Sequence, residues 1–456
     1  MISKDRVLLS IGLVGFALAI IISGGKDHFV STIAMSALMI YLWLTESVPI
    51  YVTALIPLIV GIPLGILDAD LIAGAYGNKM IFLFLGGFIL ALGLEKWHVH
   101  KQVARIIIHT VGYSKPRILL GFLISTALLS MWVSNTATAL MMLPMALAVI
   151  NVLPEKEQKG KFALFLLLSI AYAASIGGMG TLIGSPPNAI MAGILKDSFD
   201  VTISFADWMK IGVPISIILI AVIYTFFYFS MGKETKDSLD DFKLEKKPWI
   251  GPQKRVVIIF SGVVFLWLMR SIIKKHTGFD YGDESAAILG SFLLFLVPGE
   301  NKMPLLNWKD TEKLPWGILL LFGGGLALAA AMDANGEIQY MSTWFELFKT
   351  WHYFVLLTII IAIAIFGTEF MSNTALITLF IPVIGAFASV SHYDILQLCI
   401  PVTLAASCAF MLPVGTPPNA IVFSSGKITI AQMARVGVVF NFIALFIIAL
   451  IAYFYI

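Results

Sequence analysis

Two short polar strings stand inside some of the most apolar sequence in this chain. Ser134-Asn135-Thr136 and Ser372-Asn373-Thr374 lie 238 residues apart, and each has a helix-breaking partner, Gly184-Ser185-Pro186-Pro187-Asn188 or Gly415-Thr416-Pro417-Pro418-Asn419. Hydroxyl and amide side chains both donate and accept hydrogen bonds. A broken helix adds free N–H groups, which favour an anion, and free carbonyls, which can hold a cation. The four segments therefore indicate a site for an anion and alkali cations.

The positive charge that such a site needs has to come from outside the motifs. No lysine or arginine lies in or beside any of the four segments. A multiply charged anion at membrane depth is costly without compensation. Co-bound cations are the natural compensation, and sodium prefers the oxygen ligands that these segments supply, so binding of anion and cation would be linked. A single polar string more often only joins helices, but two paired strings favour a site.

The composition is that of a membrane protein. Of the 456 residues, 59% are hydrophobic and 12% are charged, whereas about 25% of the residues of soluble domains are charged. Cys399 and Cys408 lack the spacing of a metal site or a disulfide framework. The first apolar run follows Lys4 and Arg6 but has no small-x-small cleavage site, so we interpret it as a retained helix. We expect a polytopic protein in a lipid bilayer, with no nucleic-acid partner.

The apolar runs predict an all-α fold of about 11 transmembrane helices and two re-entrant hairpins. The hairpins are expected at about 117–152 and 353–388, because each block is too long for one helix and holds a Ser-Asn-Thr string. Helices are expected at about 7–24, 30–47, 49–67, 76–97, 161–195, 210–231, 255–272, 285–298, 315–333, 394–424 and 432–455. The helices at 161–195 and 394–424 should be broken at their Pro-Pro pairs, and 96–117 should be a basic loop.

The paired strings belong to a longer repeat. We divide the chain into an N-terminal helix (1–29), repeat 1 (30–232), a cytoplasmic linker (233–254) and repeat 2 (255–456). Each repeat has an odd number of spans, so the halves should face opposite ways, an architecture typical of secondary transporters. The alternative is an old duplication without a shared site. With the N-terminus in the cytoplasm, most of the 30 lysines and arginines fall on the cytoplasmic side, as the positive-inside rule requires.

The paired motifs resemble the divalent anion/sodium symporter family, which includes the INDY-type di- and tricarboxylate carriers. The likeness covers essentially the whole chain, including Leu44-Thr45-Glu46-Ser47-Val48-Pro49 and Thr368-Glu369-Phe370-Met371. It implies a homodimer in the cell's inner (plasma) membrane, each protomer having a scaffold domain and a transport domain. It also implies an elevator-type mechanism, in which the transport domain slides across the membrane against the scaffold.

The resemblance also implies roles for individual residues. The substrate carboxylates would bind residues of the hairpin tips and the helix breaks, namely Asn135, Thr136, Ser185, Pro186, Asn373, Thr374, Thr416 and Pro417. One sodium ion would bind Ser130, Ser134, Asn135 and Gly184. The other would bind Thr368, Met371, Asn373 and Gly415, and of these Met371 and Gly415 offer only their carbonyls.

We therefore expect a sodium-coupled secondary transporter that imports C4 dicarboxylates such as succinate. The alternatives are a sodium-independent dicarboxylate exchanger and a symporter for citrate or sulfate. Neutral side chains at Ser130, Ser134 and Thr368 favour symport, because an exchanger could use fixed positive charges instead. An anion channel would need a continuous pore, and an enzyme would need a nucleophile–base pair or a metal cluster, which the strings lack.

Two acidic residues stand close to the motifs, and their expected roles are structural. Glu46 ends the second predicted helix and is expected at the membrane interface. Glu369 precedes the second Ser-Asn-Thr string at membrane depth, where an ionisable residue is a functional hypothesis by default. A structural hydrogen bond within the hairpin is expected there rather than direct contact with a cation.

Overall fold

The computed structural model describes residues 4–25, 27–232, 239, 247–338, 340, 351–391 and 393–455. In these residues helices form the regular structure, and the β pairing is limited to one isolated bridge between Pro298 and Pro304. Eight of the described helices are long and apolar enough to cross a membrane, and shorter apolar helices accompany them. The chain is therefore an all-α, multi-pass membrane protein, as the sequence predicted.

The helices follow the predicted order. The first half contains α1 (Lys4–Ile22), α2 (His28–Thr45), α3 (Ile50–Thr53), α4 (Ile56–Val60), α5 (Ala69–Tyr76), α6 (Lys79–Lys96), α7 (Val99–Val111), α8 (Lys115–Ser130), α9 (Asn135–Asn151), α10 (Lys161–Gly178), α11 (Pro186–Phe199) and α12 (Phe205–Met231). The second half contains α13 (Gly251–Thr277), α14 (Asp283–Leu296), α15 (Trp316–Ala334), α17 (Tyr353–Gly367), α18 (Asn373–Ser391), α19 (Ile395–Ala406), α20 (Pro417–Phe423) and α21 (Ile430–Tyr455). Most of the predicted linker 233–254 lies outside the described residues.

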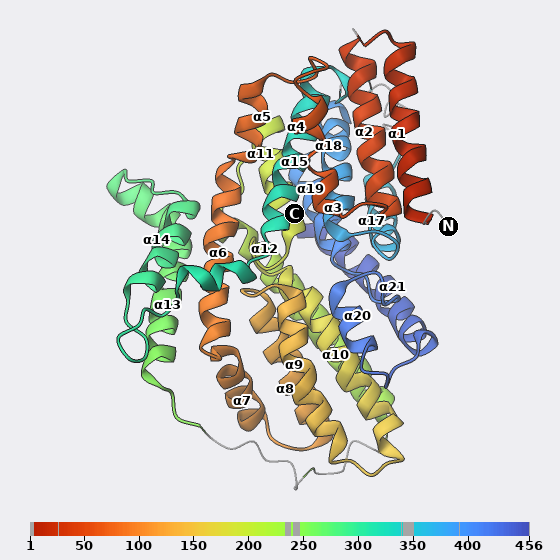
Figure 1. Cartoon of the computed structure of the whole chain (residues 1–456). Coiled ribbons are helices and arrows are strands. Elements are labelled where there is room, and N and C mark those ends of the chain that lie inside the picture. Colours follow the sequence, from red (N-terminus) through yellow and green to blue (C-terminus); the bar gives the residue numbers. More distant parts are fainter. Residues whose placement is uncertain are drawn as a thin grey trace.

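Both blocks predicted as hairpins consist of two helices joined at the polar string. The turn 131–134 joins α8 to α9, and the turn 368–372 joins α17 to α18. Figure 1 shows α8 and α9 in the lower half of the molecule and α17 and α18 in the upper half. The broken helices also run in opposite directions, since α10 lies below α11 whereas α19 lies above α20. The division into two inverted repeats at 30–232 and 255–456 stays a prediction that this arrangement favours.

Three segments differ from the sequence prediction. The helix α5 (Ala69–Tyr76) was not expected. The single helix expected at 49–67 is replaced by the short helices α3 and α4. Pro57 lies in the first turn of α4 and lacks the N–H that a continuous helix would direct to the carbonyl four residues earlier. The loop expected at 96–117 contains α7, an amphipathic helix that buries Val99, Ala104 and Ile108. Its alternation of basic and apolar residues has the helical period of a surface-lying helix.

Small residues allow the helices that carry the motifs to pack at backbone distance. A Cβ atom at Gly177 on α10 would overlap the backbone of Ala127 on α8. A Cβ atom at Gly324 on α15 would overlap the backbone of Ala54, directly after α3. Glycines commonly permit such close helix contacts in membranes. These contacts fix the first hairpin against α10 and fix the α3 segment against α15.

The Gly177 contact makes a testable prediction. Gly177→Ala should lower the midpoint of thermal unfolding in detergent, because overpacking a close contact costs about 1–3 kcal/mol. The matched control is Gly262→Ala on α13, where a Cβ atom would meet nothing within 4 Å. Equal unfolding midpoints for the two variants would contradict the close packing of α8 on α10.

Candidate functional site

All four motif segments line one cavity of about 450 Å³. The first half contributes Ser134, Asn135, Thr136, Ser185, Pro186 and Pro187 to its wall, and the second half contributes Met371, Ser372, Asn373, Thr374, Gly415, Thr416, Pro417 and Pro418. Every residue predicted to bind substrate is among them. The structure thus brings together strings that are more than 230 residues apart in sequence.

A further part of the cavity wall comes from helices outside the hairpins and the broken helices. Ile318 and Leu321 of α15 line the cavity, as do Tyr51 of α3 and Glu46, which directly follows α2. That Glu46 lies at the membrane interface stays a prediction, and the structure adds that it lines the cavity. Its place in the cavity wall depends on how the chain turns after α2.

The predicted sodium-binding residues fall into two layers. Ser134, Asn135, Met371, Asn373 and Gly415 line the cavity directly. Ser130, Gly184 and Thr368 are buried behind this layer and do not reach the cavity wall. The residues of the second layer can therefore act on the cavity only through their contacts with the first layer.

In the first half, the side-chain amide of Asn135 lies among three oxygen atoms. One amide atom is 2.7 Å from Ser130 Oγ, 3.0 Å from the Ala174 carbonyl oxygen and 3.1 Å from the Gly184 carbonyl oxygen. Turned inward, the amide nitrogen supplies two hydrogens, and the Ser130 hydroxyl donates a third to the Ala174 carbonyl at 2.6 Å, so the three oxygens are satisfied without an ion. Turned the other way, the amide oxygen would join the three others in a set of four oxygens. Such a set of hydroxyl, amide and carbonyl oxygens suits a hard cation.

The second half repeats this arrangement. Thr368 Oγ1 lies 3.0 Å from the Ala406 carbonyl oxygen and also forms a hydrogen bond to the amide oxygen of Asn373. Thr368 has one hydroxyl hydrogen for these two acceptors. Each hairpin therefore places a hydroxyl and an amide against a carbonyl of the neighbouring broken helix. With the amide oxygen facing the set, the oxygens outnumber the available hydrogens in both halves.

Two asparagines outside the predicted site hold the helix breaks in shape. Asn188 Nδ2 donates to the carbonyls of Gly178 at 3.0 Å and Thr181 at 2.8 Å. Asn419 Nδ2 donates to the carbonyls of Ala409 at 3.0 Å and Leu412 at 2.9 Å. Both side chains are fully buried. The signal was present in the sequence, since an asparagine follows Pro-Pro in both halves, but its role became apparent only from the structure.

Glu369 supports the break between α19 and α20. Its Oε1 accepts hydrogen bonds from the backbone N–H groups of Phe410 at 2.8 Å and Met411 at 2.9 Å and from Asn441 Nδ2 at 2.8 Å. Its Oε2 accepts from the Leu412 N–H at 3.0 Å. A carboxylate that accepts several backbone N–H groups is stabilised without a cationic partner. Glu369 does form structural hydrogen bonds, but the expectation that they lie within the hairpin was wrong, because their partners lie in the neighbouring broken helix and in α21.

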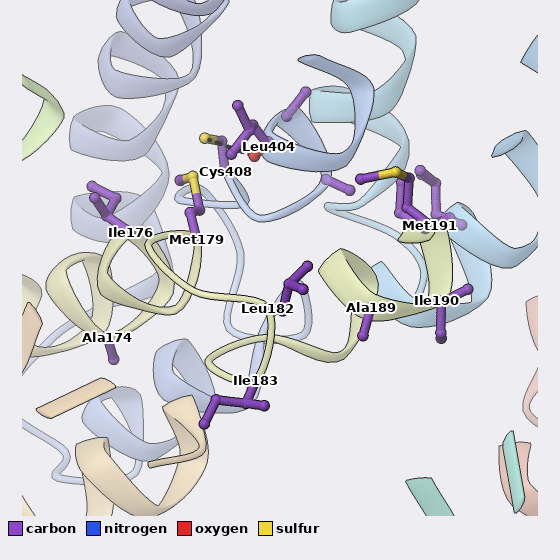
Figure 2. Close-up of a cluster of buried hydrophobic side chains, with 14 of the residues drawn as sticks. Ala174, Ile176, Met179, Leu182, Ile183, Ala189, Ile190, Met191, Leu404 and Cys408 are labelled. Atoms are coloured by element: carbon purple, nitrogen blue, oxygen red, sulfur yellow. Dashed lines mark hydrogen bonds between the residues drawn. The ribbon is translucent and has the colours of Figure 1, made fainter. Parts of the chain in front are cut away.

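The break between α10 and α11 is packed in apolar side chains. Figure 2 shows Met179 at the start of this loop, beside the buried side chains of Cys408 and Leu404 from the second half, with Leu182 and Ile183 further along the loop. Cys399 and Cys408 are both free and buried. The non-helical backbone at the site is therefore enclosed by protein, which is the condition for irregular backbone at membrane depth.

An all-α membrane protein in which two hairpin tips and two helix breaks meet in one cavity is built like a secondary transporter. A family model of the sodium:sulfate symporter transmembrane region matches residues 10–456. The chain is 40% identical over 449 residues to the sodium-dependent dicarboxylate transporter SdcS of Staphylococcus saprophyticus, covering 94% of this chain and 86% of that protein. It is 38% identical over 439 residues to SdcS of Staphylococcus aureus, covering 90% and 83%. The chain therefore belongs to the divalent anion/sodium symporter family and is a transporter rather than an enzyme.

Two solved transporters share the fold at low sequence identity. The YdaH transporter of Alcanivorax borkumensis superposes with a TM-score of 0.60 at 12% identity, over 85% of this chain and 89% of that one. MtrF of Neisseria gonorrhoeae, described as one of a class of antimetabolite efflux pumps, gives a TM-score of 0.60 at 14% identity, over 85% and 82%. At these identities the likeness concerns the fold alone.

The contacts of Glu369 predict the effect of its neutral isostere. Glu369→Gln replaces an accepting oxygen by an NH₂ group that faces donors, and a buried donor left unsatisfied costs about 1–3 kcal/mol. The unfolding midpoint in detergent should therefore fall. Glu155→Gln, in the exposed loop between α9 and α10, changes the net charge equally and should leave the midpoint unchanged. If both variants melt like the parent, the carboxylate does not hold the break.

Proposed function

We propose that this protein is a sodium-coupled secondary transporter that imports C4 dicarboxylates such as succinate. The observation that carries the proposal is the meeting of both Ser-Asn-Thr tips in one cavity. Three helices of substantial length, α9, α11 and α18, begin at residues that line this cavity. Their free N–H groups carry partial positive charge and favour a bound anion. A dianion can therefore be bound there without lysine or arginine.

The dianion would bind between the two tips. Asn135 and Thr136 would bind one carboxylate, and Asn373 and Thr374 the other, each by amide and hydroxyl donors. Ser185, Pro186, Thr416 and Pro417 would complete the pocket from the two helix breaks. The names of the SdcS relatives, which are sodium-dependent dicarboxylate transporters, support this choice of substrate class.

Sodium would bind behind each tip, where the amide oxygen can turn toward the neighbouring hydroxyl and carbonyl oxygens. The first ion would bind Ser130, Ser134, Asn135 and Gly184, and the second Thr368, Met371, Asn373 and Gly415. Because Asn135 and Asn373 would contact both the ion and the substrate, each ion would orient the amide that binds a carboxylate. This shared ligand couples the two binding events.

Alternating access would follow an elevator-type mechanism. The hairpins α8–α9 and α17–α18 and the broken helices α10–α11 and α19–α20 would move together and carry the site. The wall formed by Glu46, Tyr51 and α15 would belong to the stationary scaffold. The family resemblance supports a homodimer in the inner (plasma) membrane, and the distribution of lysine and arginine supports a cytoplasmic N-terminus.

An uptake assay in proteoliposomes separates this proposal from other substrates and other modes of transport. The family model carries sulfate in its description, which favours a sulfate symporter as the second candidate, and citrate and dicarboxylate exchange complete the set. The purified protein in proteoliposomes should accumulate labelled succinate only with an inward sodium gradient. Uptake that needs internal dicarboxylate instead of sodium would indicate an exchanger, and flux without accumulation would indicate a channel.

The tip asparagines should be essential for this activity. Asn135→Ala and Asn373→Ala each remove a donor to the substrate and an oxygen for sodium, so sodium-driven succinate uptake should fall to background. Both variants should still insert into the membrane, because neither side chain lies in the packed core between helices. Uptake in proteoliposomes and membrane insertion are measured together. If either variant takes up succinate with the kinetics of the parent protein, the assignment of that asparagine to the site is wrong.

Alanine substitutions of Thr368 and Met371 should affect the sodium requirement of uptake differently, although both residues are assigned to the same ion. Thr368→Ala removes a side-chain oxygen and should raise the sodium concentration for half-maximal uptake by about tenfold, equivalent to ~1.4 kcal/mol. Met371→Ala keeps the main-chain carbonyl and should change this concentration much less. Uptake measured against sodium concentration, at constant ionic strength, separates the two. An equal change in both variants would argue against a hydroxyl ligand.

A further inference from the structure

Glu46 is the one charged side chain among the described residues that line the central cavity. Its charge has the sign opposite to that expected in a pocket for an anion. The Glu46 side chain is exposed and lines the cavity. A carboxylate in the wall of a pocket proposed for an anion calls for a role in binding.

The backbone at Glu46 is held in an unfavourable conformation. Glu46 has φ 47° and ψ 26°, in the left-handed region, at the C-terminal end of α2. Glycine or asparagine commonly occupies this position, because a longer side chain is disfavoured there. Residues kept in such conformations cluster at functional sites. Glycine would form this helix end with less strain, so a carboxylate at Glu46 is retained against a local preference.

The turn after α2 fixes where this carboxylate lies. Trp43 Nε1 donates to the Ile50 carbonyl at 3.1 Å and so closes the turn from α2 into α3. Thr45 Oγ1 donates to the Tyr41 carbonyl at 2.8 Å in the last turn of α2. Tyr51 packs its ring directly on Gly317 of α15. These contacts hold the backbone of the turn that carries the carboxylate.

We propose that the Glu46 carboxylate strengthens the binding of sodium in the cavity and weakens the binding of a dicarboxylate while no sodium is bound. The inference rests on the proposed function. A fixed negative charge in a low-dielectric cleft concentrates cations and repels anions. With no ion bound, the cavity disfavours a dianion. Once sodium is bound, the repulsion is offset, and the helix N-termini and tip amides can bind the carboxylates.

This role predicts opposite effects on the two ligands. Glu46→Gln keeps the size of the side chain and removes its charge. The sodium concentration needed for half-maximal thermal stabilisation, measured without dicarboxylate, should rise at least about threefold. The succinate concentration for half-maximal stabilisation in saturating sodium should stay the same or fall, because a repulsive charge is gone. A merely structural role would weaken both ligands together.

The experiment compares purified parent, Glu46→Gln, Glu46→Gly and Glu155→Gln. Each is titrated with NaCl against choline chloride at constant ionic strength, then with succinate in saturating NaCl. Glu46→Gly removes the charge while relieving the left-handed backbone, so it tests the charge even if Glu46→Gln folds poorly. Glu155→Gln removes a charge that does not line the cavity and should behave like the parent.

The outcomes separate this inference from the proposed function. If the parent shows no sodium-dependent stabilisation or uptake, the proposed function fails. If the parent responds to sodium and both Glu46 variants respond at the same concentration, Glu46 has no part in loading cations. Weaker binding of both ligands in both variants would also overturn the inference, because it would assign Glu46 to the shape of the cavity.

Discussion

A helix that ends inside a membrane leaves backbone groups without partners, and lipid cannot supply them. The rest of this structure depends on how those groups are satisfied. Asn188 and Asn419 each bind two carbonyls of their break through one side-chain NH₂ group. Glu369 binds three backbone N–H groups of the second break. Trp208 and Tyr172 donate to one further carbonyl in each break, at 2.8 and 3.0 Å. Only with these bonds made can a polar cavity persist among apolar helices.

The two halves solve this common problem with different side chains. The second break is held by the carboxylate of Glu369, which is itself tied to Asn441 on α21. The first break uses the hydroxyl of Thr181, which accepts from the Gly184 N–H at 3.0 Å and donates to the Met131 carbonyl. The hairpin tips are alike, whereas their supports are not. The second half consequently has an acidic side chain buried in its support, and the first half has Met131 at the matching position.

The sequence predicted the parts of the site that repeat. Asn135 and Asn373 were recognisable because the same string occurs twice in apolar sequence, and helix breaks at the Pro-Pro pairs follow from the missing N–H of proline. Pro57 should have indicated the break between α3 and α4 by the same reasoning. The position of Glu46 in the cavity wall was not predictable, because it depends on how the chain turns after α2. The bonds of Glu369 join residues more than 40 positions apart, and sequence spacing carries no information about such contacts.

The two tips come from different halves of the chain, and this has a consequence for the choice of diacid. In the proposed site the amide of Asn135 binds one carboxylate of the diacid, and the amide of Asn373 binds the carboxylate at its opposite end. The distance between the two amides then determines which carbon-chain length fits. A small tilt of one half would change that distance to suit a shorter or longer acid while every motif residue stayed the same. Related carriers with unaltered motifs can therefore differ in substrate specificity. Substitutions that change the preferred diacid should lie in helix contacts far from the ligand.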